Sequence, residues 1–157
     1  MTLLDFIPTR NPGYVRPFHL SRLCAALDKI GSEPMRRIFW HGPRCGLTQT
    51  LMAAMQQRPD LTYGYASRRK MNTDQVIARV GRPGIFSAHG PTLGRRISGA
   101  IFLDDYNAGD DLPERLMTRL LPGASIFIFA DERTFGESPH AEFRAAALRL
   151  GFRAGWV

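Results

Sequence analysis

The strongest constraint on the fold of this chain is the alternation of short apolar runs with segments of helical periodicity. The runs at 37–40, 100–103 and 124–130 are too short for buried helices and are typical of buried strands. Between them, at 48–57 and 73–80, apolar residues recur every three or four positions, as in amphipathic helices. Strands that are apolar on both faces indicate a parallel sheet covered on both sides. The sequence therefore predicts an α/β fold with a mainly parallel sheet flanked by helices.

The rest of the chain follows the same pattern. Residues 1–17 contain Pro8, Pro12 and Pro17 and are predicted to form an extended N-terminal arm. Residues 18–157 are predicted to form one domain, because 157 residues suit a single core and no linker interrupts them. Further helices are expected at 18–30, 113–121 and 140–150, and further strands at 61–66, 84–87 and 152–157. Thr73 is a candidate helix cap, and Gly81 is expected to end that helix.

A glycine-containing loop follows the expected strand at 37–40 and precedes a helix. Such a loop turns backbone N–H groups toward a phosphate, and the helix N-terminus adds a partial positive charge. The full phosphate-loop motif is G-x-x-x-x-G-K-[ST]. Here the spacing of the two glycines is one residue short, and leucine occupies the lysine position. The candidate nucleotide-binding residues are Gly42, Pro43, Arg44, Cys45, Gly46, Leu47, Thr48 and Gln49.

The missing lysine is the main departure from this motif. That lysine normally contacts the β- and γ-phosphates and stabilises charge in the transition state, which Leu47 cannot do. Arg44 is the candidate replacement and is assigned a catalytic role. Thr48 supplies a hydroxyl for Mg²⁺. The alternative is a plain strand-to-helix turn in which Thr48 only caps the helix.

Two carboxylates follow the expected strand at 100–103. Asp104 is the candidate Mg²⁺ ligand and Asp105 the candidate base that orients the attacking water, so both are assigned catalytic roles. The alternative is a strand followed by an Asp-rich turn. Asp131 and Glu132 follow the strand at 124–130, where a γ-phosphate sensor could stand. The order of these segments suits a sheet with one strand between the two motif strands.

The positive charge of the chain is mostly arginine, and the net charge is +7. Arginine suits two-pronged contacts to phosphate. The sharpest clusters are Arg68, Arg69 and Lys70 and the pair Arg95 and Arg96, which are the candidate nucleic-acid contacts. The alternative for either cluster is a solvated loop. No apolar stretch approaches the length of a membrane span, so no membrane association is expected.

These motifs together resemble the ATPase domain of viral large terminases, the DNA-packaging motors. The resemblance rests on the segments 16–18, 36–40, 65–70, 93–96 and 101–105. It implies a three-layer P-loop NTPase-like fold, ATP and Mg²⁺ as cofactors, and DNA as a partner. The sequence departs from the family at Leu47, and at Asp105, where glutamate is usual. A viral Rep-type helicase is similar too, through W-x-G-P-x-x-G and Leu-Asp-Asp-Tyr.

Two functional hypotheses remain open from the sequence. In the first, the chain is an ATPase that acts with DNA, as in packaging or helicase motors, with Arg44 in place of the lysine. In the second, it is a degenerate phosphate-loop domain that no longer hydrolyses nucleotide and serves as a nucleic-acid-binding or partner-regulating module. The expected partners are DNA, further copies of the chain, or a separate ATPase or nuclease chain. The expected location is the cytoplasm, that of a host if the protein is viral.

Overall fold

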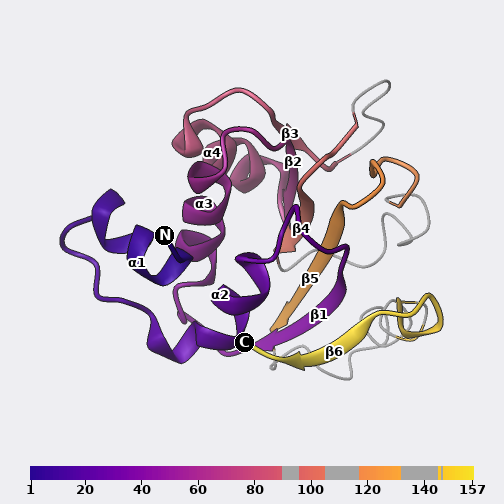
Figure 1. Ribbon diagram of the computed structural model, residues 1–157, viewed down its shortest axis with the longest axis horizontal. Helices are drawn as coiled ribbons and strands as arrows, with labels where there is room; N and C mark the ends of the chain where they lie inside the picture. Colours follow the sequence, from indigo (N-terminus) through magenta and orange to yellow (C-terminus); the bar gives the residue numbers. More distant parts are fainter. Residues whose placement is uncertain (90–95, 105–116, 132–144, 146) are drawn as a thin grey trace.

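The fold is built around a six-stranded parallel sheet. The computed structural model describes residues 1–89, 96–104, 117–131, 145 and 147–157 (Figure 1). The strands lie in the order β3-β2-β4-β5-β1-β6, and every neighbouring pair is parallel. Their bounds are β1 Arg36–His41, β2 Tyr63–Ser67, β3 Ile85–Ser87, β4 Ala100–Asp104, β5 Ser125–Asp131 and β6 Arg153–Trp156. The predicted α/β fold with a parallel sheet is confirmed.

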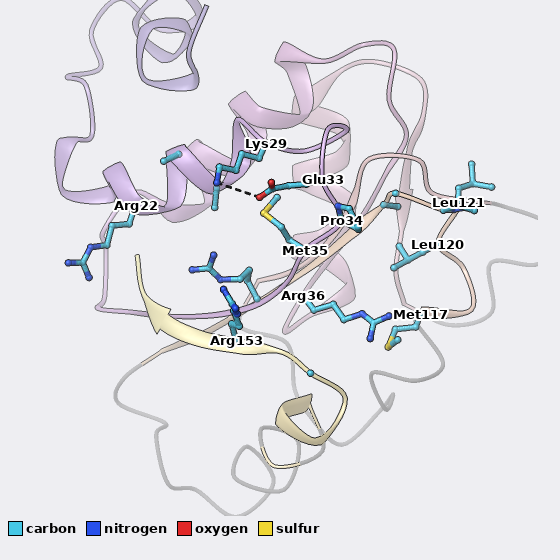
Figure 2. A pocket seen from close by; sticks show the side chains of 17 residues that line it. Arg22, Lys29, Glu33, Pro34, Met35, Arg36, Met117, Leu120, Leu121 and Arg153 are labelled. Atoms are coloured by element: carbon cyan, nitrogen blue, oxygen red, sulfur yellow. Dashed lines mark ion pairs between the residues drawn. The ribbon is translucent and has the colours of Figure 1, made fainter.

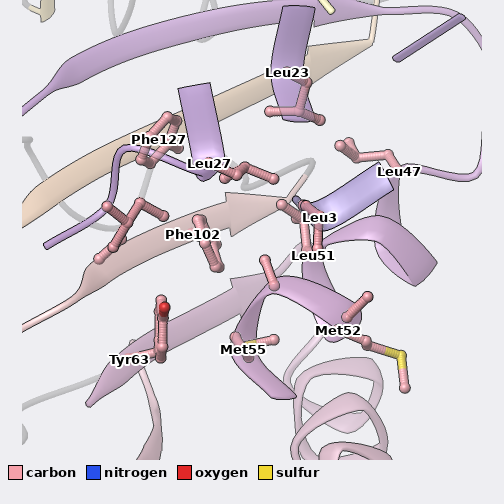
Figure 3. Packing of buried hydrophobic residues seen from close by; sticks show 14 of the residues in the cluster. Leu3, Leu23, Leu27, Leu47, Leu51, Met52, Met55, Tyr63, Phe102 and Phe127 are labelled. Carbon is pink, nitrogen blue, oxygen red and sulfur yellow. The ribbon is translucent and has the colours of Figure 1, made fainter. Parts of the chain in front are cut away.

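Four α-helices of the described residues lie on one side of this sheet (Figure 1). They are α1 Leu3–Arg10, α2 Ser21–Leu27, α3 Leu47–Gln57 and α4 Lys70–Val80, and the short 3₁₀ helix η1 Phe18–Leu20 leads into α2. Leu23, Leu27, Leu51 and Met55 of these helices meet the aromatic face of the sheet, where Phe102 is fully buried (Figure 3). Burial of this face supplies the main stabilisation of the fold.

The opposite face of the sheet carries a second, smaller core. Ile38, Ile101, Leu103 and Ile128 are buried there, and they pack with the segments that contain Met117 and Leu120, and Ala147 and Phe152. Successive residues of a strand face opposite sides, so both faces of β1, β4 and β5 are apolar. Because both faces of these strands are buried, their sequences are uniformly apolar. The arrangement is therefore an α/β protein of three layers.

The N-terminal segment is not the predicted extended arm. Leu3–Arg10 is a helix in which the side chain of Thr2 accepts a hydrogen bond from the Asp5 N–H as an N-cap. Leu3 and Ile7, four residues apart, are buried in the main core, and α1 packs against α3. Pro8 lies inside this helix and removes one N–H. Packing of the apolar face outweighs that loss, which the local sequence could not indicate.

Several element boundaries also differ from prediction. The expected helix at 18–30 is divided into η1 and α2 and ends at Leu27. Thr73 does not cap α4, since the helix begins three residues earlier, at Lys70. Gly81 does end it, with a left-handed φ of 67°. The helices expected at 113–121 and 140–150 lie mostly outside the described residues. No helix in the described ranges is long and apolar enough to cross a membrane.

Candidate functional site

Buried polar side chains gather at the carboxyl edge of the sheet. His41, Ser67, Asp104 and Asp131 are the last residues of β1, β2, β4 and β5, and all four are buried. Parallel strands end at the same edge, so these groups come together from segments far apart in the sequence. Ligands of open α/β sheets bind at this edge. The described polar groups therefore mark the carboxyl edge as the candidate site.

The two predicted motifs meet directly at this edge. The Thr48 hydroxyl, on the first turn of α3, donates a 2.8 Å hydrogen bond to Oδ2 of Asp104. β5 lies between β1 and β4, so one strand separates the strand before the loop from the strand that ends in Asp104. The sequence predicted this separation, and it is confirmed. A threonine hydroxyl and a carboxylate are thereby joined across 56 residues of sequence.

A third residue, which the sequence did not predict, also contacts the Asp104 carboxylate. The Tyr65 hydroxyl donates a 2.7 Å hydrogen bond to the same Oδ2 of Asp104. Tyr65 lies on β2, next to β4, and is fully buried. In the sequence, Tyr65 is only one residue of the expected strand at 61–66. Its role depends on the pairing of β2 with β4, which local sequence does not specify.

The loop between β1 and α3 has a strained backbone. Arg44 has a φ of 51°, the one positive value among the described non-glycine residues, and Gly46 has a φ of 82°. Left-handed residues of this kind occur in the N–H concavities that bind anions. Within the described part of the chain, the N–H groups of Cys45, Leu47 and Thr48 donate to no backbone carbonyl. The loop therefore presents donors at the N-terminus of an 11-residue helix.

Neighbouring segments hold this loop in place. A ring nitrogen of His19 lies 2.7 Å from the Cys45 carbonyl oxygen, and the Thr50 hydroxyl donates to the Gly46 carbonyl. The Tyr14 hydroxyl lies so close to Gly46 that a Cβ there would collide with it. The glycine at 46 is therefore required both by its φ and by the contact with Tyr14.

The lysine position of the motif is occupied by a core residue. Leu47 is 5% exposed and belongs to the main buried core, as do Leu51 and Leu23 (Figure 3). Its side chain cannot face a ligand, and only its backbone N–H remains for that purpose. Arg44, the predicted replacement cation, is exposed in the loop, as is Pro43. Cys45 is half-buried and Gln49 is exposed at the start of α3.

The donor set can be compared with what Mg²⁺ requires. Mg²⁺ in phosphate sites takes one or two protein oxygens and keeps several waters. A hydroxyl and a carboxylate at hydrogen-bond distance fit this requirement, and a metal could insert between Thr48 and Asp104. No group of three or more His, Cys, Asp or Glu side chains that could hold a metal occurs among the described residues. Asp105 and Glu132 lie outside those residues.

The described residues of the two predicted basic clusters lie at opposite edges of the sheet. Arg68, Arg69 and Lys70 are exposed after the carboxyl end of β2, on the same edge as the loop. Arg96 is exposed before the amino end of β4, on the opposite edge. Arg95 lies outside the described residues. Arg96 and the cluster at residues 68–70 therefore do not lie at the same strand end.

A second polar network at the carboxyl edge also escaped sequence analysis. The Thr73 hydroxyl accepts from the Ser67 N–H at 2.8 Å and lies 2.9 Å from Nε2 of His89. It joins the end of β2, the first turns of α4 and the residues after β3. This network holds the start of α4, and with it Arg69 and Lys70, at the edge of the site.

The fold and the site thus define a three-layer α/β protein with a glycine loop and a hydroxyl–carboxylate pair at one edge of its sheet. Comparison with protein-family models, with curated proteins and with solved structures found no match. The functional argument therefore depends on the geometry of the site.

Proposed function

We propose that this chain binds a magnesium nucleotide, with ATP as the first candidate, and acts as an ATPase-like domain together with DNA. The observation that carries the proposal is the 2.8 Å bond between the Thr48 hydroxyl and Asp104, across an intervening strand. This bond joins a hydroxyl and a carboxylate beside the glycine loop at one point of the sheet edge, which supports a metal site there. The resemblance to large terminases and to Rep-type helicases points to the same use of the site.

Each part of the loop has a distinct task in this proposal. The N–H groups of residues 45–48 donate to the phosphate oxygens, and the helix N-terminus adds partial positive charge. Thr48 and Asp104 hold the metal, directly or through water. When bound, Mg²⁺ neutralises charge on the phosphates. Asp105 is proposed as the group that orients the attacking water, and Arg44 as the cation near the terminal phosphate.

A second candidate function is supported by the burial of Leu47. Without a cation at this position, transition-state charge on the transferred phosphoryl group is less stabilised. The domain would then bind nucleotide without hydrolysing it and would regulate a partner chain or bind nucleic acid. Measurement of phosphate release distinguishes the two candidates, because both predict nucleotide binding and only the first predicts turnover.

The test of the proposed site is calorimetric titration of the wild type, Thr48→Val and Asp104→Asn with MgATP. We expect wild-type binding in the micromolar range and a loss of about 10- to 100-fold in affinity in each variant, the range typical of metal-site changes. Asp74→Asn, which removes an exposed carboxylate on α4, is the matched control and should bind as the wild type does. Absence of wild-type binding at millimolar MgATP would overturn the proposal.

A separate prediction concerns Tyr65. Tyr65→Phe removes the 2.7 Å bond to Asp104 and leaves the ring in place. Because this bond orients the carboxylate, we expect Mg²⁺-dependent nucleotide affinity to fall by about 10-fold. Nucleotide binding in EDTA should change little.

The matched control for this prediction is Tyr63→Phe. Tyr63 lies two residues earlier on the same face of β2, and burial raises its pKa to about 12. Its hydroxyl donates to none of the described residues, so its loss should leave the magnesium dependence unchanged. Equal effects of the two variants would show that Tyr65 contributes only packing.

A further inference from the structure

A second site lies at the amino edge of the sheet, opposite the glycine loop. A groove of about 850 Å³ runs between α2, the starts of β1 and β6, and the segment 117–124 (Figure 2). The loop stands at the carboxyl end of β1, so about 20 Å of strand separates the two regions. We propose that this groove binds the sugar–phosphate backbone of nucleic acid. The proposal rests on the proposed function only in the choice of nucleic acid as partner.

The lining of the groove is strongly basic. α2 supplies Arg22, and the turn after it supplies Lys29. β1 supplies Arg36 and Arg37, and Arg153 is added by the edge strand β6. Five cations from three separate segments thus surround one groove, and Figure 2 shows how the side chains of Arg22, Lys29 and Arg153 border it.

Little negative charge offsets these cations. Among the described residues of the lining, Glu33 is the one acidic residue, and it pairs with Lys29 at 3.4 Å. Both side chains of that pair are more than half exposed, so the pair is weak and Lys29 can exchange it for another anion. Arg36 donates to the Leu150 carbonyl, a neutral acceptor. The groove therefore retains a positive potential.

Arg37 and Arg153 give the clearest indication of an anionic ligand. They are register partners in the parallel pairing of β1 and β6 and so lie side by side on the same face. Like charges in direct register are destabilising. Nε of Arg37 is buried and has no hydrogen-bond partner among the described residues, and the guanidinium carbon lies 4.9 Å from the centroid of the Phe39 ring. An oxyanion between these two arginines would relieve the repulsion.

The shape and chemistry of the groove favour a phosphate backbone over a small anion. Its volume exceeds that of a single phosphate, and apolar residues such as Met35, Leu120 and Leu121 also line it. Such surfaces accept sugars or bases while arginine forks contact phosphates. Arg96 continues the basic edge, because its neighbour Ile97 bridges to Leu120 of the lining. Because the groove and the glycine loop lie at opposite edges of the sheet, nucleic acid and nucleotide can bind at the same time.

The test is fluorescence anisotropy with a labelled 12-nucleotide thymidine oligomer at low salt, in EDTA and without nucleotide. Arg22→Gln combined with Arg153→Gln removes two exposed cations and leaves the core intact. We expect affinity to fall by about 10- to 100-fold and the slope of log affinity against log salt to decrease by about 1.4, at roughly 0.7 per phosphate contact. Arg37→Gln alone should weaken binding by about 10-fold.

Arg10→Gln combined with Arg79→Gln removes the same charge from exposed sites on α1 and α4 and is the matched control. Equal affinity of the groove and control variants would overturn the proposal. So would equal competition by polyglutamate at matched charge, which would instead indicate an acidic protein partner. Asp104→Asn should bind the oligomer as the wild type does. This result separates failure of the groove from failure of the nucleotide site.

Discussion

Replacement of Phe102 by alanine is expected to lower the free energy of unfolding by about 4 kcal/mol. Phe102 is fully buried at the centre of the aromatic face of the sheet. Its ring centroid lies 5.6 Å from that of Tyr63 and 5.7 Å from that of Phe127, with Phe129 at 6.3 Å. Removal of the ring leaves a cavity that three strands and α3 cannot close, because their own packing fixes them.

Urea denaturation followed by circular dichroism measures this effect. At about 2–4 °C per kcal/mol for a chain of this size, the melting temperature should fall by roughly 10 °C. Phe18→Ala is the control, because Phe18 is 65% exposed and its loss should cost under about 0.5 kcal/mol. A loss below about 1 kcal/mol at Phe102 would contradict the packing described for this face.

Replacement of Arg82 by alanine is the second change with a large expected effect, about 3 kcal/mol of lost stability. Its guanidinium donates four hydrogen bonds to backbone carbonyls. The acceptors are Met55 at 2.7 Å, Arg58 at 3.0 Å, Leu61 at 2.8 Å and Pro83 at 2.7 Å. It also lies over the Tyr63 ring. Arg82 thereby ties the end of α3 to the start of β2, and its loss leaves several partly buried carbonyls without their donor.

The surroundings of Arg82 agree with this structural role. Desolvation lowers the pKa of Arg82, while the nearby Tyr63 and Asp60 act in the opposite direction. The pKa stays far above neutrality, so the contribution should not vary with pH between 5 and 8. Arg82→Lys keeps the charge but lacks the planar fork, and it should recover less than half of the stability.

Thermal and urea unfolding of Arg82→Ala, Arg82→Lys and Arg79→Ala test this prediction together. Arg79 is exposed on α4, so its replacement removes the same side chain without these bonds and should be nearly neutral. A neutral effect of Arg82→Ala would show that water satisfies the four carbonyls as well as the guanidinium does.

The candidate site was partly predictable from the sequence. A glycine loop after one strand and a carboxylate after another identified Thr48 and Asp104, because each motif is local and each follows an apolar run. The sequence showed that lysine is missing from the motif. Only the structure showed that the side chain of Leu47, which takes its place, is buried in the core. Tyr65 was missed because its hydroxyl reaches Asp104 only when β2 and β4 are neighbours.

What the sequence by itself determined is the type and order of the described strands and of α3 and α4, because hydrophobic periodicity and glycine positions are properties of neighbouring residues. Only the tertiary structure decided which strands are neighbours and which side chains meet. Tertiary packing also stabilises the helix Leu3–Arg10 despite Pro8, because burial of Leu3 and Ile7 outweighs the loss of one N–H donor. It also gathered Arg22, Arg37 and Arg153 around one groove. Such contacts depend on strand order and register, which arise from packing of the whole chain and not from any local pattern.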